Sequence, residues 1–246
     1  TVFSKQSLEE ICDLIIEENR TRKAEHRKLL YVMYDQIYWA LTQEGIEHYN
    51  PVTLRPEMKE YTIFVDGVSK SLSATGIRVG WSMGPAFIIN KMKAILTHVG
   101  AWAPRAEQLA TAKYLSNLEL YDKFLIEQKN KIKIRLDRFY NGFQKLKSEG
   151  FKVDAVSPQA GIYLTVQFDL VGQKTSSGEL LNSTEDVAKY LLDDAKIAIV
   201  PFYAFGSSKQ STWYRVSIGT CRVEDIDRVF INIKQSLQKL SQLVDI

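Results

Sequence analysis

Residues 61–81 read "YTIFVDGVSKSLSATGIRVGW" and decide the fold and the chemistry that can be expected of this chain. The apolar start, "YTIFV", is typical of a strand covered on both faces of a sheet. A lysine, Lys70, follows among small and hydroxylated residues, and an arginine, Arg78, comes eight residues later between Gly76 and Gly80. Small residues around a lysine and an arginine at the end of a buried strand indicate room for a bound molecule.

A second apolar run, "KLLYVMYD", precedes this stretch and ends at Asp35. The segment between the two runs, "YNPVTLRPEMKE", carries two prolines and is expected to be a loop. In α/β sheets, ligands bind beyond the carboxyl ends of the strands. If the two runs are adjacent parallel strands, Asp35 and Lys70 should face the same crevice, with Tyr38 one turn beyond Asp35.

These side chains suit one type of ligand. A lysine amine forms a Schiff base with an aldehyde, and a carboxylate beside a ring nitrogen keeps that nitrogen protonated. An arginine offers fixed donors to a phosphate, and a tyrosine hydroxyl can donate to a phenolate oxygen. An aldehyde, a ring nitrogen, a phenolate and a phosphate together describe pyridoxal 5'-phosphate (PLP).

The motifs also carry a family resemblance. "DQIYWAL" followed by "DGVSKSLSATGIRVGW" resembles the aspartate/tyrosine and lysine/arginine signatures of the class I/II aminotransferases, which are PLP-dependent enzymes of fold type I. Tyr38 lies three residues after Asp35, Lys70 thirty-five after Asp35, and Arg78 eight after Lys70, as in that family. The late segment "YRVSIG" is similar to the family's carboxylate-binding segment, and its arginine here is Arg215.

The resemblance implies a role for each matching residue. Lys70 would be the catalytic Schiff-base lysine, which holds PLP and then moves the proton at the substrate Cα. Asp35 would pair with the ring nitrogen, and Tyr38 would donate to the phenolate oxygen.

The remaining matches imply binding roles. Arg78 would hold the phosphate, with Ser69 as a second donor. Arg215 would bind the substrate α-carboxylate through a bidentate pair.

The resemblance also implies an α/β fold in two domains. Residues 1–119 would be the C-terminal part of a large, mostly parallel α/β/α PLP-binding domain, residues 120–150 a long linking helix, and residues 151–246 a small α+β domain. Strand-like pieces in the small domain are "FKVDAV", "GIYLTVQF", "IAIVPF" and "WYRVSIG". The polar segment 171–183, "VGQKTSSGELLNS", is expected to be an exposed insertion.

The expected function is a PLP-dependent aminotransferase. It would move an amino group from an α-amino acid, with aspartate as the default donor, to a 2-oxo acid such as 2-oxoglutarate. Two alternatives stay open: a PLP-dependent lyase or synthase of the same fold, and a non-catalytic, aminotransferase-like regulatory binding module. Because fold type I sites usually form at a dimer interface, a homodimer is expected.

The composition argues against several other kinds of protein. Lys and Arg total 32 against 29 Asp and Glu, and this balance argues against nucleic-acid binding. No apolar run approaches the ~20 residues that span a bilayer, and two cysteines fit a cytoplasmic protein. The three histidines share no metal-ligand spacing, so no metal is expected.

The chain begins "TVFSKQ" without methionine. By resemblance, a missing N-terminal portion would complete the phosphate site, and this truncated chain alone would be inactive.

Overall fold

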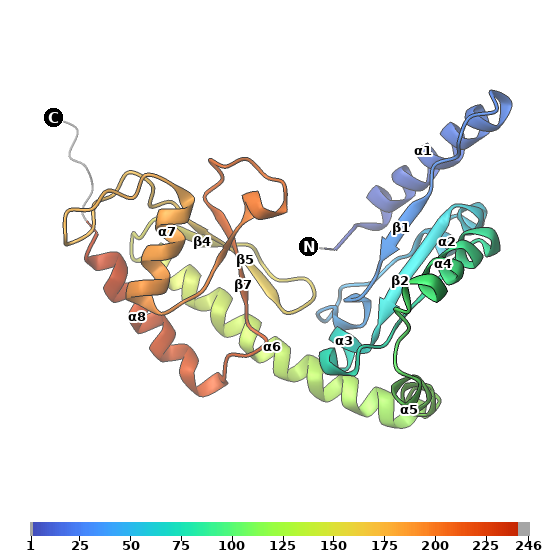
Figure 1. The fold of residues 1–246 in the computed structure, drawn as a ribbon. Helices are drawn as coiled ribbons and strands as arrows, with labels where there is room; N and C mark the ends of the chain where they lie inside the picture. The colour runs from blue at the N-terminus through green and yellow to red at the C-terminus, as the bar shows by residue number, and fades with distance from the viewer. Residues whose placement is uncertain (1, 241–246) are drawn as a thin grey trace. The chain divides into compact units, whose positions relative to one another are not determined.

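The computed structural model of the chain describes residues 2–240, which fall into two compact units (Figure 1). The first unit comprises the chain up to Lys129 together with Gln159–Gly161, and the second comprises Asn130–Pro158 and the chain from Ile162 onward. Each unit combines a sheet with helices, so the predicted α/β class is confirmed. The boundary between the units falls inside helix α6 (Leu118–Ser148). The separate linking element expected at residues 120–150 remains a prediction.

The first unit contains a three-stranded sheet in the order β1-β2-β3. Strands β1 (Val32–Asp35) and β2 (Thr62–Gly67) are parallel and in register, with Asp35 opposite Val65. Strand β3 (Gly80–Met83) runs antiparallel to β2. The connection from β2 to β3 contains only single turns of helix, which cannot cross back over the sheet as a parallel connection requires.

Helix α1 (Lys5–Ala24) buries Leu8, Cys12 and Ile16 against Met58 and Tyr61. The sequence predicts Ser7 as the N-cap of this helix, and that prediction is wrong by one turn. Ser4 is the cap, because its hydroxyl accepts a hydrogen bond from the backbone N–H of Ser7 at 3.1 Å.

The segment expected to be a loop between β1 and β2 contains two single helical turns, α2 (Pro51–Leu54) and η2 (Pro56–Glu60). Each turn begins with a proline, whose fixed φ suits the first helical position and whose missing N–H needs no partner there. Asn50 caps α2 by accepting from the N–H groups of Val52 and Thr53. The two prolines therefore start helical turns in this segment.

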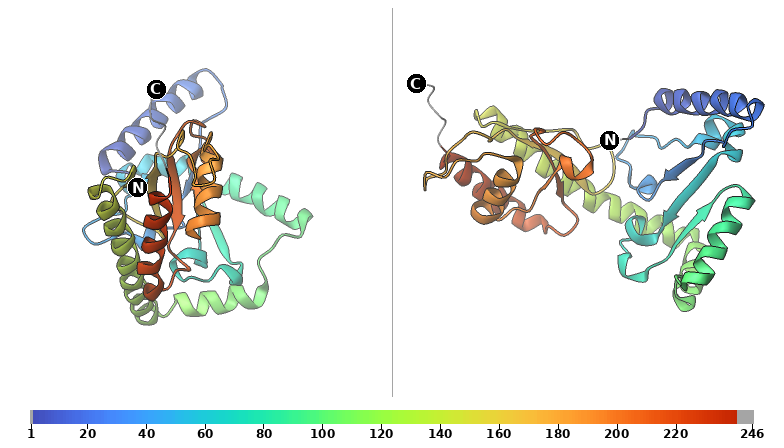
Figure 2. Two further views of the ribbon diagram at one scale, coloured as in Figure 1. Left: turned by 90° about the vertical axis from the view of Figure 1, so that its left-hand side faces the viewer. Right: turned by 45° about the horizontal axis from the view of Figure 1, so that its top comes forward.

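Helices α4 (Ala86–Val99) and α5 (Arg105–Leu115) follow the sheet, joined by a short segment around Gly100 (Figure 2). Neither helix has a fully buried residue. The long α6 that comes next is a single helix, as the pattern predicts. Within residues 2–240, no helix combines the length and the apolar character needed to cross a membrane.

The second unit contains an antiparallel sheet in the order β4-β5-β7-β6, and all four strands predicted for this region are confirmed. Phe143 of α6, Phe168 of β5 and Tyr214 of β7 are fully buried in its core, and Phe230 of α8 packs against Phe143. The strands are β4 (Val153–Ala155), β5 (Tyr163–Phe168), β6 (Val200–Pro201) and β7 (Trp213–Ser217), and the helices are α7 (Thr184–Tyr190), the π-turn η4 (Leu191–Ala195) and α8 (Ile226–Gln238).

The polar segment 171–183 is mostly exposed, as predicted, but two of its residues are buried. Leu181 is buried, and the hydroxyl of the buried Thr175 accepts a hydrogen bond from the N–H of Glu179. Apolar and hydrogen-bonded anchors therefore hold this segment against the second unit.

Candidate active site at the ends of the first two strands

The first unit places Asp35, Tyr38, Ser69 and Lys70 near the carboxyl ends of β1 and β2. Asp35 is the last residue of β1, and Lys70 lies on the single-turn helix α3 (Val68–Ser71), which follows β2 directly. Because β1 and β2 are parallel and paired, their carboxyl ends lie at the same edge of the sheet. The prediction that Asp35 and Lys70 follow adjacent parallel strands is confirmed.

Lys70 and Tyr38 lie close together. The Lys70 ammonium is 5.9 Å from the centroid of the Tyr38 ring. The backbone carbonyl of Lys70 accepts a hydrogen bond of 3.0 Å from the side-chain amide of Gln128 on α6, which fixes α3 in place. A methyl group added to Gly161 would meet the Tyr38 ring at 3.4 Å, so Gly161 lies against this ring. The short chain segment at Gly161 is held by a hydrogen bond from its N–H to the carbonyl of Leu41.

Asp35 is exposed and has few internal partners. One carboxylate oxygen, Oδ1, accepts a hydrogen bond of 3.1 Å from the N–H of Ile37, two residues on. Among residues 2–240 the structure gives this carboxylate no ion pair. It therefore keeps acceptor capacity for a bound donor.

Asp66 follows Val65, the residue that pairs with Asp35 across the two strands. Unlike Asp35, it is buried. Its carboxylate is buried and accepts hydrogen bonds from the indole Nε1 of Trp39 (2.8 Å), the N–H of Gly67 (2.7 Å) and the amide of Gln36 (3.5 Å). Burial raises the pKa of Asp66, although the three hydrogen bonds act against that rise. The sequence reasoning missed this residue. The available signal was a carboxylate at the end of a buried strand, which requires donors from elsewhere.

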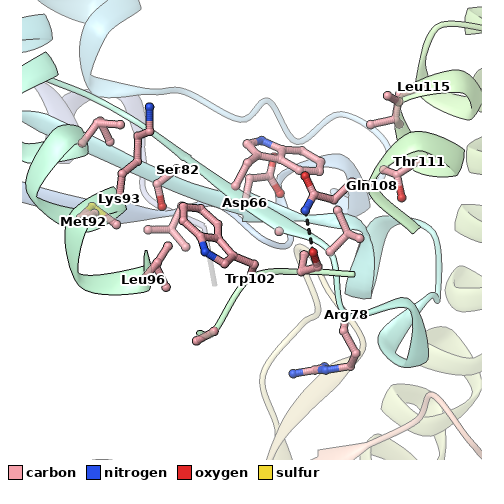
Figure 3. Close-up of a pocket in the computed structure, with 18 residues that line it drawn as sticks. Asp66, Arg78, Ser82, Met92, Lys93, Leu96, Trp102, Gln108, Thr111 and Leu115 are labelled. Atoms are coloured by element: carbon pink, nitrogen blue, oxygen red, sulfur yellow. Dashed lines mark hydrogen bonds between the residues drawn. The ribbon is translucent and has the colours of Figure 1, made fainter. Parts of the chain in front are cut away.

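Arg78 ends the single 3₁₀ turn η3 (Thr75–Ile77), which lies between α3 and β3. It has the left-handed conformation, with φ 60°, and its guanidinium donates to the carbonyl of Thr75 at 3.0 Å. In Figure 3 its side chain extends away from Asp66. Ser69 is half-buried beside Lys70 on α3. Among the described residues, no hydrogen bond or ion pair links Arg78 to Asp35, Ser69 or Lys70.

Two cavities adjoin these residues. One, of about 690 Å³, lies between the β2-β3 face and helices α4 and α5 and is lined by Asp66, Trp102 and mostly apolar neighbours, with Arg78 at its edge (Figure 3). The other, of about 470 Å³, is lined by Asp35 and Tyr38 among others. The structure thus brings Asp35 and Tyr38 into one cavity and Lys70 to Tyr38, while Arg78 lines a different cavity.

Two of the glycines near Lys70 are also required by the packing of the sheet. The sequence suggests that they leave room for a ligand. A Cβ on Gly67 would lie 2.9 Å from the carbonyl oxygen of Val79, and one on Gly80 would lie 3.0 Å from that of Asp66. These two glycines face each other across β2 and β3, so the close approach of the two strands requires them.

Arg215 lies in the second unit, on β7. Its guanidinium is stacked against two rings, 4.2 Å from the centroid of Tyr163 and 4.4 Å from that of Phe205. Stacking on aromatic rings holds the planar group while its edge N–H donors stay available. In the part of the chain that the structure describes, no acidic side chain pairs with Arg215, so it can accept a carboxylate ligand.

Comparisons with known proteins agree with this geometry. The sequence profile of the family "Aminotransferase class I and II" matches residues 7–233. An aspartate aminotransferase of Bacillus sp. (strain YM-2) is 30% identical over 230 residues, which are 92% of this chain and 53% of that protein. A probable aspartate/prephenate aminotransferase of Rickettsia bellii (strain RML369-C) is 28% identical over 85% of this chain and 50% of its own length. This chain therefore spans about half the length of the curated relatives that it matches.

Solved structures show the same fold. The aspartate aminotransferase from Rhizobium meliloti superposes with a TM-score of 0.82 at 24% identity, over 97% of this chain and 55% of that one. The aromatic aminotransferase from Pyrococcus horikoshii OT3 gives a TM-score of 0.78 at 25% identity, over 97% of this chain and 56% of that one. The predicted fold type is confirmed.

Proposed function

This chain belongs to the class I and II aminotransferase family, and we propose from that membership that the protein transfers an amino group from an α-amino acid to a 2-oxo acid with PLP as its cofactor. Several relatives are named as aspartate aminotransferases. Aspartate is therefore the donor that we propose first, with 2-oxoglutarate as the acceptor.

The observation that carries the proposal is the position of the Lys70 ammonium beside the Tyr38 ring. Both residues follow the parallel strands β1 and β2, and β1 ends at Asp35. These residues fit PLP by the chemistry of their side chains. Asp35 has a carboxylate oxygen left to accept from a ring N–H, and Tyr38 has a hydroxyl to donate to a phenolate oxygen. When bound, PLP supplies an aldehyde for an amine and a ring that withdraws electrons from the bonds at the substrate Cα.

The chain's own residues would divide the remaining work. The Lys70 amine would hold the cofactor and then move the proton at the substrate Cα. Arg78 and Ser69 would bind the phosphate, since the Arg78 guanidinium uses one N–H donor for the carbonyl of Thr75 and has others to offer.

Arg215 would bind the substrate α-carboxylate. Tyr163 and Phe205 hold its guanidinium in a fixed plane, which lowers the entropy lost when a carboxylate binds in the bidentate geometry. We also propose a homodimer, as is usual for sites of this type, and a cytoplasmic location.

The first test is chemical labelling of the intact protein. It would be incubated with PLP, reduced with borohydride, digested and mapped by mass spectrometry, with the Lys70→Ala variant as control. We expect a pyridoxyl group on the peptide that contains Lys70 and none on that peptide in the variant. A label confined to other lysines, or an equal yellow colour in the variant, would contradict the proposal.

Product analysis separates the aminotransferase from related chemistry. With aspartate and 2-oxoglutarate we expect oxaloacetate and glutamate in equal amounts. Release of ammonia or pyruvate without an oxo acid would favour a lyase instead.

A further inference from the structure

The carboxylate of Asp66 is an unusual feature of the first unit. Among residues 2–240, Asp66 is the only buried residue of the types Asp, Glu, Lys and Arg, with 7% of its surface exposed. A buried carboxylate without a cationic partner carries a large desolvation cost, and only hydrogen bonds to its charged form can offset that cost.

The donors to Asp66 come from both strand ends. Gln36 and Trp39 lie in the turn after β1, on either side of Tyr38, while Gly67 begins the turn from β2 into α3. One side chain therefore links the turn that carries Tyr38 to the turn that carries Lys70. In the described structure no hydrogen bond joins Asp66 to Asp35 or Lys70, so the hydrogen-bonded link to these two residues passes through the turns. Direct repulsion from Asp35 adds to the rise in the pKa of Asp66.

A purely structural role does not require a charge at this position. Because burial disfavours the ionised form of Asp66 and raises its pKa, a neutral side chain of the same shape would avoid that cost. What a neutral amide cannot do is accept from both the Trp39 indole and the Gly67 N–H. An asparagine has one acceptor oxygen, and its NH₂ group would face one of the two donors.

We propose that Asp66 is a positioning residue, whose carboxylate sets the placement of Tyr38 and Asp35 relative to Lys70 by binding Trp39 and Gly67 at the same time. This inference rests on the proposed function of Lys70. It assigns a role to a buried group that the reaction does not touch.

The test compares Asp66→Asn, Trp39→Phe and the double variant in the intact protein. Trp39→Phe removes the indole donor and keeps the carboxylate. Asp154→Asn is the matched control, because Asp154 also accepts from the following backbone N–H and from a glutamine amide, but lies on β4 of the second unit. The readouts are kcat and KM, the melting temperature, and the NMR signal of the Trp39 indole N–H in cofactor-free protein, assigned by its absence in Trp39→Phe.

We expect the indole signal to move upfield in Asp66→Asn as its hydrogen bond weakens. We expect kcat to fall on the order of 100-fold in both single variants, the size expected for a misplacement of about 1 Å in an active site. The double variant should be no slower than the slower single one, and KM for the amino acid should change less than ~3-fold because Arg215 is untouched. Asp154→Asn should leave the kinetics and the indole signal unchanged.

Three results would overturn the proposal. They are an indole signal that does not move in Asp66→Asn, an unchanged kcat in a folded Asp66→Asn variant, and losses that simply add in the double variant. If Asp66→Asn does not fold, kcat in Trp39→Phe still tests the proposal. A wild-type kcat in that variant would contradict a role for the hydrogen bond between Trp39 and Asp66. Failure of the proposed function is visible separately as full activity in Lys70→Ala.

Discussion

Asp35 and Asp66 stand at the ends of neighbouring parallel strands, but their environments suit them to different work. Asp35 is exposed and retains acceptor capacity, while Asp66 is buried and accepts three hydrogen bonds. A ligand donor can therefore be received by Asp35 and not by Asp66. The same residue type, one position apart in the paired register, is therefore open to a ligand at one strand end and bound to internal donors at the other.

Gly67 offers a test of the close approach between β2 and β3. Its φ of 175° is ordinary extended backbone, so only the contact with Val79 and Gly80 forbids a side chain. We expect Gly67→Ala to lower the free energy of unfolding by about 1–3 kcal/mol, because the two strands must separate to accept the methyl group. Urea unfolding measures this, with Gly76→Ala as control, since a Cβ there meets nothing within 4 Å. Equal stability of the two variants would show that the strands yield freely.

His48 should give the first unit a pH dependence. Its ring packs near Tyr34 and Trp39, its Nε2 is buried without a partner, and burial lowers its pKa, although the nearby Asp66 acts in the opposite direction. The folded state therefore resists protonation more than the unfolded state, whose histidine titrates near pH ~6.5. Stability contributed by neutral His48 is present above that pH and is lost as the pH falls through the lower folded pKa.

We accordingly expect His48→Phe to gain stability relative to the wild type as the pH falls from about 7.5 to about 5. Phenylalanine keeps an aromatic ring in place and has no nitrogen to protonate or leave unpaired. The measurement is the difference in unfolding free energy between the two proteins by urea titration at each pH. A difference that stays constant over this range would refute the assignment.

The sequence could identify candidate site residues but not their surroundings. Spacing alone predicted that Asp35, Tyr38 and Lys70 would follow two adjacent strands, because strand ends and side-chain types are local properties. The contacts of Asp66 with Trp39 and Gln36 join residues about thirty positions apart. Such contacts depend on how the turns pack, and no local pattern encodes that.

At the scale of the elements, α3 is the critical piece, because this single turn carries Lys70 and is too short to be stable alone. Its support comes from α6, where Gln128 is buried and donates to the carbonyl of Lys70. We expect Gln128→Leu to cost about 0.5–1.5 kcal/mol, the net value of one hydrogen bond, because the carbonyl of Lys70 still accepts from the N–H of Ser73. We also expect this variant to weaken PLP binding to the intact protein.

Gln144 on the same helix provides the control for this prediction. Its amide donates to the carbonyl of Ala155 in the second unit. Gln144→Leu should lower stability without changing the affinity for PLP, measured by titrating the absorbance of the bound cofactor. If both variants weaken PLP binding equally, support of α3 by Gln128 is not specific.

Element patterns in the sequence were informative where burial is regular. The apolar runs predicted β1, β2 and the four strands of the second unit, and a long helix was expected where α6 lies. The predictions were wrong where the same residue type is compatible with two local structures. The prolines at 51 and 56 fit a loop as well as a helix start, and Ser4 and Ser7 both suit an N-cap. Only backbone hydrogen bonds distinguish these cases.

Across the whole molecule, the two units differ in how their apolar surface is covered. In the second unit the inward side chains of β5, at Leu164, Val166 and Phe168, are almost completely buried, and β5 is paired on both sides. In the first unit the described part of the sheet pairs β1 and β3 on one side only, with Met33 74% and Met83 52% exposed.

This contrast predicts a large difference in local stability. Segments with few buried contacts and unpaired strand edges open at low free energy, whereas a doubly paired, buried strand opens only with its whole unit. We expect backbone amides in β5 to exchange with deuterium on the order of 100-fold more slowly than those in β3 when the chain of residues 1–246 is studied alone. Pepsin peptides that cover 163–168 and 80–83 would measure this by mass spectrometry. Equal protection of the two strands would mean that the first sheet is as stable as the second despite its open edges, and would place the support of Lys70 in the helices rather than in the sheet.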